Sequence, residues 1–317
     1  MDRSGRLDAL DQRIIAKLRA APRIQNRALA EAVGVSAPTL YARLRALEAA
    51  KVCEVRAQRD FGAMGYQRLA FVDVTVSGRA VRDVAVDIAA IDATLAVLEF
   101  VEEPRLSIPV VAADDTDLRE LVTHQIGGIA GIMRLATYPA LHTHRYAQEF
   151  GEIQADRHLP LPSIPAQIQT DEVDELILEA LRLDARLSNR AIATQLGLSE
   201  PNVRRRISSL CQRKVLTFTL VTSPAALGLT AWGYIRLAYP PRLARDIVEY
   251  MKTSAECVSI SEAAGQWNLH CWALFKDDSH LTTFSDNIGG LFNHDATFSV
   301  RKIHHVEKHN CDYMKIV

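Results

Sequence analysis

One stretch of this chain occurs twice. Asn26–Lys51 and Asn189–Lys214 align without a gap when the sequence is shifted by 163 residues, and Asn, Arg, Ala, Gly, Ser, Pro, Leu and Lys recur at matched positions. A fixed internal offset of this kind predicts that the whole chain is a tandem duplication. Whatever fold one half adopts, the other half is expected to repeat it.

The repeated stretch has the pattern of two helices joined by a tight turn. In the second copy, Gly197 stands where the first of these helices must end in a left-handed residue, and Ser199 can cap the next helix. Three apolar residues of that next helix fall three and four apart, so they share one buried face: Val203, Ile207 and Leu210. The first copy repeats this spacing with Leu40, Leu44 and Leu47.

The opposite face of the second helix is polar and basic. Arg205 lies opposite the apolar stripe, Asn202 lies on the same side, and Arg204 and Arg206 flank it. A helix that packs by one side and offers Arg and Asn on the other suits the major groove of DNA. The sequence therefore indicates a DNA-reading helix, and the alternative interpretation is an ordinary solvated helix face.

The overall charge of the chain does not oppose a nucleic-acid partner. Although the formal net charge is −1, residues 1–60 carry twelve Lys and Arg against seven Asp and Glu, and residues 199–214 carry five against one. Affinity for DNA depends on the cations that meet phosphate, so the local balance is the relevant quantity. Both helix-turn-helix stretches are locally basic.

The hydrophobic period changes after each helix-turn-helix. The short β-prone segment Val52–Gln58 is expected to form the hairpin of a winged helix-turn-helix, and from Leu69 apolar residues alternate with period two. The order strand, helix, strand, strand, helix, strand then follows, and the second half repeats it from Trp232 to Val306. We therefore predict an α+β fold with two winged helix-turn-helix domains and two ferredoxin-like βαββαβ domains.

Three prolines between the copies, Pro160, Pro162 and Pro165, indicate a semi-rigid linker. The expected boundaries are 1–60 and 170–223 for the helix-turn-helix domains, 61–150 and 224–317 for the ferredoxin-like domains, and 151–169 for the linker. The chain shows no apolar run of about 18 residues and no signal peptide, so we expect a cytoplasmic protein with no membrane partner. The five cysteines form no CxxC pair, which argues against a zinc ribbon or a disulfide framework.

These motifs carry a family resemblance. LAEAVGVS followed by RLRALE, and then a ferredoxin-like module, resembles the Lrp/AsnC (feast/famine) family of transcription regulators, and the resemblance covers nearly the whole chain, twice. It implies DNA binding through the helix-turn-helix, dimerisation through the ferredoxin-like domain (the RAM domain of the family), and modulation by an amino acid or similar small effector. The chain departs from the family by carrying two units, and by having Lys51 and Lys214 where members usually have Gly.

The resemblance assigns DNA-reading positions in both copies. They are Ser36, Thr39, Tyr41, Ala42 and Arg43 in the first copy, and Ser199, Asn202, Arg204, Arg205 and Arg206 in the second. Tyr41 of the first copy stands where the second has Arg204, and Ala42 stands where it has Arg205. Arg can make a bidentate contact to guanine, whereas Ala offers at most a methyl contact to thymine, so we expect an asymmetric operator with the stronger contact from the second copy.

A Gly-x-x-Asp arrangement before the third strand of the RAM domain is the effector pattern that the resemblance implies. The second copy has Gly265, Gln266, Trp267 and Asn268, whereas the first copy has 102–105 (EEPR) at the aligned positions. We therefore expect the C-terminal copy to hold any effector. This effector need not be a standard amino acid, because neutral Asn cannot pair with an ammonium as Asp does. The alternative interpretation is a β-turn with a packing Trp.

Two function classes fit these patterns. The first is a regulator, with double-stranded DNA, a small effector and a second copy of the chain in a homodimer as partners. The second is the siroheme decarboxylases, which resemble the same two-module plan and use His and Arg near the sheet for a tetrapyrrole. Decarboxylase halves would be expected to lose the basic helix and to show a His-Asn-Tyr-like run. This chain keeps 204–206 (RRR) and lacks such a run, so we expect a regulator and not an enzyme.

No cofactor is expected beyond a possible small effector. His142 and His144 would share one face of a strand, which makes metal binding chemically possible, but no second ligand pair has a convincing spacing. We therefore expect no metal site.

Overall fold

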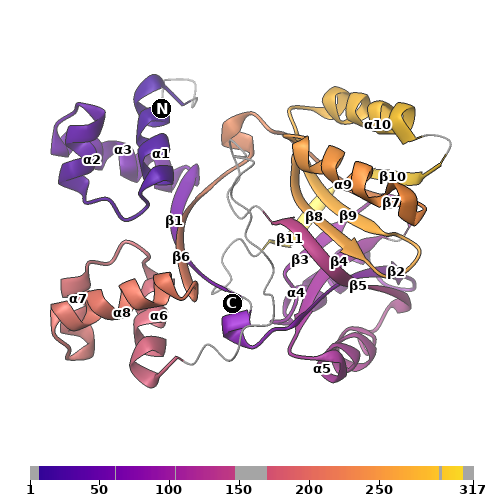
Figure 1. The fold of residues 1–317 in the computed structure, drawn as a ribbon, viewed down its shortest axis with the longest axis horizontal. Helices are drawn as coiled ribbons and strands as arrows, with labels where there is room; N and C mark the ends of the chain where they lie inside the picture. Colours follow the sequence, from indigo (N-terminus) through magenta and orange to yellow (C-terminus); the bar gives the residue numbers. More distant parts are fainter. Residues whose placement is uncertain (1–6, 61, 104, 147–169, 293–294, 310–317) are drawn as a thin grey trace.

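The computed structural model describes residues 7–60, 62–103, 105–146, 170–292 and 295–309. The two helix-turn-helix domains lie on one side of the molecule and the two ferredoxin-like domains on the other (Figure 1). The predicted linker, 151–169, falls outside the described residues. No described helix is both long enough and apolar enough to cross a membrane.

Each helix-turn-helix domain consists of three helices whose ends follow the sequence signals. The first contains α1 (Ala9–Ala20), α2 (Asn26–Val33) and α3 (Ala37–Ala49), and the second contains α6 (Glu172–Leu183), α7 (Asn189–Leu196) and α8 (Glu200–Gln212). Gly34 and Gly197 end α2 and α7 in the left-handed conformation, with φ of 71° and 68°. The predicted pairs of helices, and the glycine that ends the first helix of each pair, are confirmed. Ser199, expected to cap α8, stands at its N-cap position but makes no side-chain capping hydrogen bond.

The strand that follows each helix-turn-helix belongs to a ribbon shared by the two copies. β1 (Cys53–Arg59) pairs with β6 (Leu216–Thr222) in antiparallel register, from Cys53 opposite Thr222 to Arg59 opposite Leu216. This ribbon replaces the hairpin expected within each domain. A two-stranded element needs packing to be stable, and here both helical units pack against it in one continuous hydrophobic core.

The two ferredoxin-like domains have the predicted strand–helix order. The first contains β2 (Arg68–Val76), α4 (Val81–Ala89), β3 (Ala96–Glu99), β4 (Leu106–Ala112), α5 (Asp115–Glu120) continued by the π-helical segment η2 (Leu121–Ile126), and β5 (Ile132–Tyr146). The second contains β7 (Ala231–Ala238), α9 (Ala244–Thr253), β8 (Cys257–Ala263), β9 (Leu269–Phe275), α10 (Asp278–Phe292) and β10 (Thr297–Lys302). Their sheet orders, β5-β2-β4-β3 and β10-β7-β9-β8, are equivalent, which confirms the α+β tandem fold.

The two four-stranded sheets are joined into one. The far half of β5 pairs with β8 of the second copy, and a last strand, β11 (His305–His309), pairs with β3 of the first, giving nine strands in one hydrogen-bonded order. Separate apolar clusters lie under the helices of each copy. Two further clusters combine residues of both copies, so the inner faces of the sheets pack on one another while the helices lie outside (Figure 1).

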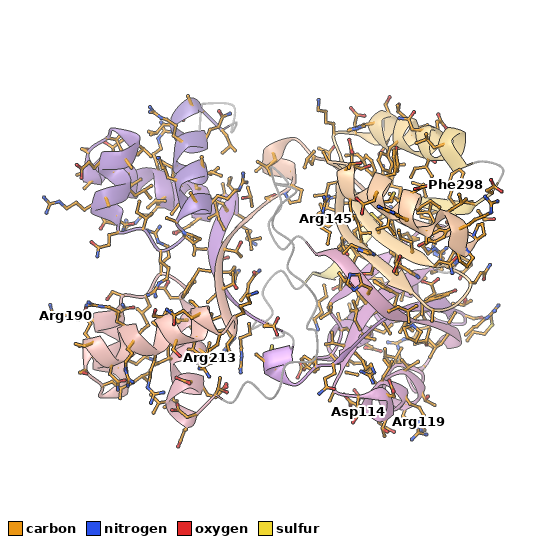
Figure 2. The ribbon with its side chains drawn as sticks, viewed as in Figure 1. Asp114, Arg119, Arg145, Arg190, Arg213 and Phe298 are labelled. Carbon is orange, nitrogen blue, oxygen red and sulfur yellow. The ribbon has the colours of Figure 1, made fainter. Side chains whose placement is uncertain are left out.

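A long cation from each copy reaches across to the other. Arg145 on β5, labelled in Figure 2, donates to the backbone oxygens of Ser254 and Cys257 just after α9. Lys308 on β11 donates to the backbone oxygen of Ile91 and to Thr94 just after α4. Arg145 and Lys308 are 163 residues apart, so the contact is reciprocal, and a cation at a helix C-terminus is electrostatically favourable. The RAM domains therefore pair within one chain.

Candidate nucleic-acid interface

The predicted reading residues of α8 lie on the surface of the second helix-turn-helix. Arg204 has a side chain that is 66% exposed and is bonded to Glu200 at 3.1 Å. The Arg205 guanidinium donates to Asn202 Oδ1 at 3.1 Å on the same exposed side. Both contacts are local and can be exchanged for contacts to a base edge, because exposed pairs contribute little stability.

Arg206 and its equivalent in the first copy, Arg43, are placed differently from the other arginines. Arg206 donates to Asp171 and to the buried Asp174 at the start of α6, and Arg43 donates to Asp8 and to the buried Asp11 at the start of α1. The hydrogen bond from the Asp11 backbone, assisted by the Arg43 guanidinium, lowers the pKa of Asp8 to about 2. These arginines therefore fasten the third helix of each unit to its first helix.

The N-terminus of α3 carries the remaining predicted residues of the first copy. Ser36 caps this helix by accepting a bond from the Thr39 backbone, and the two hydroxyls lie 2.8 Å apart. Tyr41 is 51% exposed, and Ala42 is exposed beside it. Ser199 occupies the matching N-cap of α8, where its side chain makes no capping bond. Helix N-termini attract phosphate, so Ser36 and Ser199 stand where a DNA backbone contact is favourable.

Two arginines that the sequence interpretation missed hold the reading units together. Arg23, in the loop after α1, donates to the Leu187 backbone oxygen at 2.5 Å, and Arg186, in the loop after α6, donates to the Ile24 backbone oxygen at 2.9 Å. Arg186 also donates to Asn26. Because Arg23 and Arg186 are 163 residues apart, this is one contact made twice, and we call it the arginine clasp. It sets the spacing of the two units.

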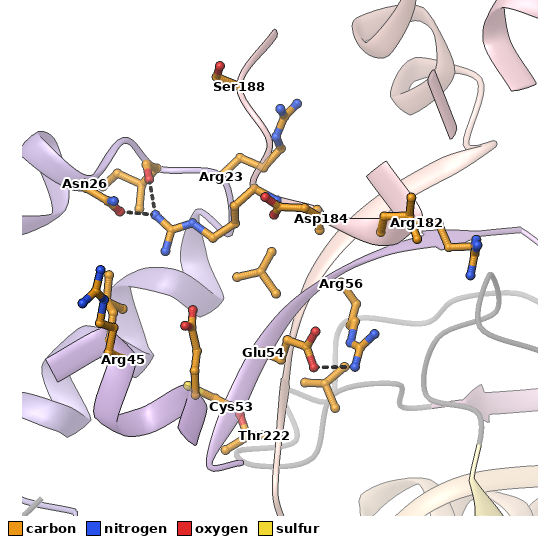
Figure 3. A pocket seen from close by; sticks show the side chains of 18 of the residues that line it. Arg23, Asn26, Arg45, Cys53, Glu54, Arg56, Arg182, Asp184, Ser188 and Thr222 are labelled. Carbon is orange, nitrogen blue, oxygen red and sulfur yellow. Dashed lines mark hydrogen bonds and ion pairs between the residues drawn. The ribbon is translucent and has the colours of Figure 1, made fainter. Parts of the chain in front are cut away.

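A groove of about 1720 Å³ opens beside the arginine clasp (Figure 3). Its basic lining residues are Arg23, Arg27, Arg45, Lys51, Arg56, Arg182, Arg186, Arg190 and Lys308, and its acidic ones are Glu48, Glu54, Asp184 and Glu200. In Figure 3, Arg56 is paired with Glu54, whereas Arg45 has no drawn partner. The excess of positive charge makes this groove suited to a polyanion.

The predicted effector residues form a turn at the border between the two RAM domains. Gly265 has φ of 125°, and a Cβ placed there would lie 2.9 Å from the Tyr138 ring of the first copy. The Asn268 side chain accepts a bond from the Tyr239 backbone, and the Trp267 ring lies 4.7 Å from the Arg236 guanidinium. Gln266 is exposed. Asn268 and Trp267 therefore support the turn, Gly265 lies close to the Tyr138 ring, and Gln266 is exposed to solvent.

A polar network lies between the two sheets, beyond what the sequence interpretation found. Arg236 pairs with Asp73 at 2.5 Å, and both side chains are buried. Burial raises the pKa of Asp73, and the Arg236 charge acts in the opposite direction. The Tyr234 hydroxyl bonds to His270 Nδ1 at 2.6 Å, and the His270 ring stacks on Phe71 with centroids 4.4 Å apart. A comparison of the two copies at offset 163 would have revealed these positions.

The sequence of this chain is similar to transcription regulators, whereas the fold of the whole chain is similar to that of an enzyme. The model of the AsnC-type helix-turn-helix domain matches residues 7–48 and 171–210, one match per copy. The chain is 30% identical over 115 residues to the HTH-type transcriptional regulator Ptr1 of Methanocaldococcus jannaschii, which covers 36% of this chain and 78% of that protein. The chain belongs to the Lrp/AsnC family. It is also 46% identical over 66 residues to the leucine-responsive regulatory protein of Rhizobium meliloti, covering 20% of this chain and 42% of that protein.

The tandem fold has a solved counterpart outside the regulators. The siroheme decarboxylase NirDL superposes with a TM-score of 0.67 at 13% identity, covering 94% of this chain and 92% of that chain, and a second structure of NirDL contains an iron-uroporphyrin III analogue. The sequence-based exclusion of an enzyme is therefore wrong. That exclusion depended on the basic helix that this chain retains. The arrangement of two helix-turn-helix units and two RAM domains in one chain is, however, also the fold of an enzyme.

The histidine pair expected on one strand is present. The rings of His142 and His144 lie 4.5 Å apart on β5. In the part of the chain that the structure describes, no group of three His, Cys, Asp or Glu side chains is arranged to hold a metal ion.

Proposed function

We propose that this Lrp/AsnC member is a sequence-specific DNA-binding regulator in which one polypeptide carries both reading units. The observation that carries the proposal is the exposed surface of α8, where Arg204 and Arg205 face solvent and the half-buried Asn202 accepts a hydrogen bond from Arg205. The β1–β6 ribbon and the arginine clasp fix this helix relative to α3. A single chain therefore carries the two linked reading helices that otherwise require a dimer of one-unit chains.

The two units are expected to read different sequences. In α3, Thr39, Tyr41 and Ala42 stand where α8 has Asn202, Arg204 and Arg205, and Ser36 and Ser199 stand at the helix starts. Arg43 and Arg206 position these helices from behind through their ion pairs. Arg205 can discriminate guanine by roughly 1 to 3 kcal/mol, and Ala42 lacks this contact. The operator is expected to be asymmetric.

The test is a footprint on the upstream region of the gene, followed by affinity measurements on the footprinted site. Arg205→Ala should weaken specific binding by roughly 5- to 150-fold and relax the base preference under α8. Arg242→Ala is the matched control, because it removes an exposed arginine paired with Asp295 on the distant RAM domain. An Arg205→Ala protein with unchanged affinity and unchanged base preference would contradict the proposal.

We further propose that a small effector binds beside the turn at Gly265 and Gln266. The Ala264 backbone donates to the Pro139 oxygen at 2.8 Å, and Gly265 lies against Tyr138, so the turn touches both copies at their border. A molecule held there would contact both RAM domains and could bias how the reading units sit. Asn268 offers no charge for an ammonium group, which favours effectors other than ordinary amino acids.

The effector is tested by thermal denaturation of the full chain with a panel of amino acids and their neutral derivatives. A ligand at about 100 times its Kd should add about 2.7 kcal/mol to the free energy of unfolding. Gln266→Ala should abolish this gain, whereas Glu103→Ala, at the equivalent position of the first copy, should preserve it. If the ligand stabilised both variants equally, the effector site would not lie at this turn.

A tetrapyrrole enzyme is the second candidate, and the shared plan with NirDL over 94% of the chain favours it. The network between the sheets offers histidine and arginine, but it does not fit a tetrapyrrole in this arrangement. Phe71, His270 and Tyr138 fill the space with ring centroids 4.4 to 5.1 Å apart. Titration with iron uroporphyrin, followed by visible absorbance, discriminates the candidates, because a saturable one-to-one spectral change would favour the enzyme.

A further inference from the structure

The central ion pair of the RAM–RAM interface joins equivalent positions of the two copies. Asp73 lies on β2, Arg236 lies on β7, and the two are 163 residues apart, which is the offset of the duplication. Each residue lies on the first strand of its own RAM domain. Because two equivalent residues meet here, the pair lies close to the approximate twofold axis that relates the two copies. They are 4% and 5% exposed, so the pair is shielded from water.

Further equivalent positions around this pair have also diverged. The strand pairing shows, independently of the sequence alignment, which positions of the two copies are equivalent. In the first sheet Phe71 is paired with Tyr138, and in the second sheet Tyr234 is paired with Arg301. Likewise Leu98 pairs with Ser107 as Ser261 pairs with His270. The diverged pairs at the interface are Asp73 and Arg236, Phe71 and Tyr234, Ser107 and His270, and Tyr138 and Arg301.

The diverged residues complement one another across the interface. Asp73 of the first copy neutralises Arg236 of the second, and Phe71 of the first provides the flat surface on which His270 of the second stacks. The Arg301 guanidinium of the second copy lies 3.8 Å from the Phe100 ring centroid of the first and donates to the Glu102 backbone oxygen. In these contacts the first copy supplies a carboxylate and two aromatic rings, and the second copy supplies two arginines and a histidine.

We propose that the inner faces of the two RAM domains form a charge-coded lock, in which a first-copy face accepts only a second-copy face. Pairing of two first copies would place Asp73 against its own equivalent with no arginine in reach. Pairing of two second copies would bury two Arg236 and two Arg301 side chains with no carboxylate from Asp73. An uncompensated buried charge is strongly destabilising, so both like pairings are less stable than the pairing of a first copy with a second copy.

The lock defines the partner that this surface fits. When two chains exchange RAM domains, the first copy of one chain can pair only with the second copy of the other. A one-unit relative that dimerises through identical faces is not a matched partner for either face. This inference does not depend on what the reading helices bind.

Three full-chain variants test the lock. Asp73→Arg faces Arg236 with a like charge, Arg236→Asp faces Asp73 with a like charge, and the double variant reverses the pair. Each single change should lower the melting temperature by roughly 6 to 20 °C, and the double variant should recover at least half of that loss. Arg68→Asp is the matched control, because it breaks an exposed ion pair with Asp115 and should shift melting by about 3 °C or less.

Mixing the two single variants gives the sharper test, because it remains informative if each variant alone is poorly folded. When Asp73→Arg and Arg236→Asp chains with different tags are expressed together, both cross-pairings become complementary, so a stoichiometric heterodimer should form. Because tagged copies of one variant can still associate through other surfaces of the homodimer, the readout is stability. The mixed dimer should melt close to wild type, whereas either variant expressed with a differently tagged copy of itself should melt as low as the single variant. Single variants that melt like Arg68→Asp, a double variant no better than the singles, or a mixed dimer that melts like the single variants would each overturn the lock.

Discussion

His270 shows how burial fixes the charge of one residue. It is almost completely buried, and this burial, together with the nearby Arg236 charge, lowers its pKa to about 3. The ring is therefore neutral in the folded protein at ordinary pH, which lets it stack on Phe71 and bond to the Tyr234 hydroxyl. An unfolded chain would take up a proton on this histidine near pH 6.5.

This difference predicts acid sensitivity. Below pH 6.5 the unfolded state binds a proton that the folded state does not, so stability is complete above pH 6.5 and is lost as the pH falls toward 3. The loss attributable to His270 should be about 2 kcal/mol between pH 7.5 and pH 5. Denaturant unfolding of wild type and His270→Gln measures it, since the variant should show that much less pH dependence. Parallel pH curves would contradict the assignment.

Arg205 and Arg206 are neighbours with different expected roles. Arg206→Ala leaves the buried Asp174 with a weaker set of partners, so it should lower the free energy of unfolding of the second unit by roughly 1 to 3 kcal/mol. Arg205→Ala should leave stability within about 0.5 kcal/mol and act on DNA affinity instead. Chemical denaturation and binding titrations of both proteins separate the effects. If Arg206→Ala left the free energy of unfolding unchanged, the structural role of Arg206 would be contradicted, and its predicted role in reading DNA would be favoured.

At the scale of elements, the ends of the third helices hold two strained residues. Lys51 and Lys214 have φ of 51° and 60°, and they are the non-glycine residues with positive φ in the described parts of the chain. A side chain in this conformation costs roughly 1 to 2 kcal/mol, which explains why family members usually have Gly there. The strain sits directly before β1 and β6, where the helical units turn into the shared ribbon.

Replacing Lys214 by Gly should therefore stabilise the chain. Glycine relieves the strain but adds entropy to the unfolded state, so the expected gain is roughly 0.5 to 1 kcal/mol. Gln212→Gly, inside the last turn of α8, is the control and should destabilise by a similar amount. Differential scanning calorimetry checks the sign, and a loss of stability in Lys214→Gly would show that the lysine side chain makes a compensating contact.

The sequence predicted helices and strands well where their signals are local. Gly34, Gly197 and Ser36 mark helix ends through neighbouring backbone groups, and period-two alternation marks β2. What it missed depends on distant partners. β1 pairs with a strand of the other copy, and Arg206 is held by Asp171 and Asp174 on another helix. The exposed Arg204 and Arg205 followed from helical periodicity alone, because exposure is set by the apolar stripe opposite.

At the scale of the whole molecule, one chain has the organisation of a dimer. The ribbon, the arginine clasp and the nine-stranded sheet are each made by contacts between the two copies. A homodimer of such chains would carry four helix-turn-helix units, of two kinds. This arrangement would let neighbouring operators be bound at the same time, which raises the effective concentration of the second binding event.

We predict that the homodimer forms in solution and that each chain within it keeps its own RAM pair. Light scattering after size exclusion should give twice the chain mass of 35.2 kDa. The Asp73→Arg and Arg236→Asp double variant should give the same value, because dimerisation would use surfaces other than the lock. A mass of one chain would refute the homodimer and leave the internal pairing intact.

The path of β5 has an implication for how such a gene can change. Because its far half completes the sheet of the second copy, and β11 covers β3 of the first, neither half retains finished sheet edges after the other is deleted. A chain that ended after the first repeat would have unpaired strand edges, and its Asp73 carboxylate would lie on an uncovered sheet face without Arg236. Division of such a gene into two self-sufficient proteins would therefore require new residues both at the sheet edges and on the inner faces of the sheets.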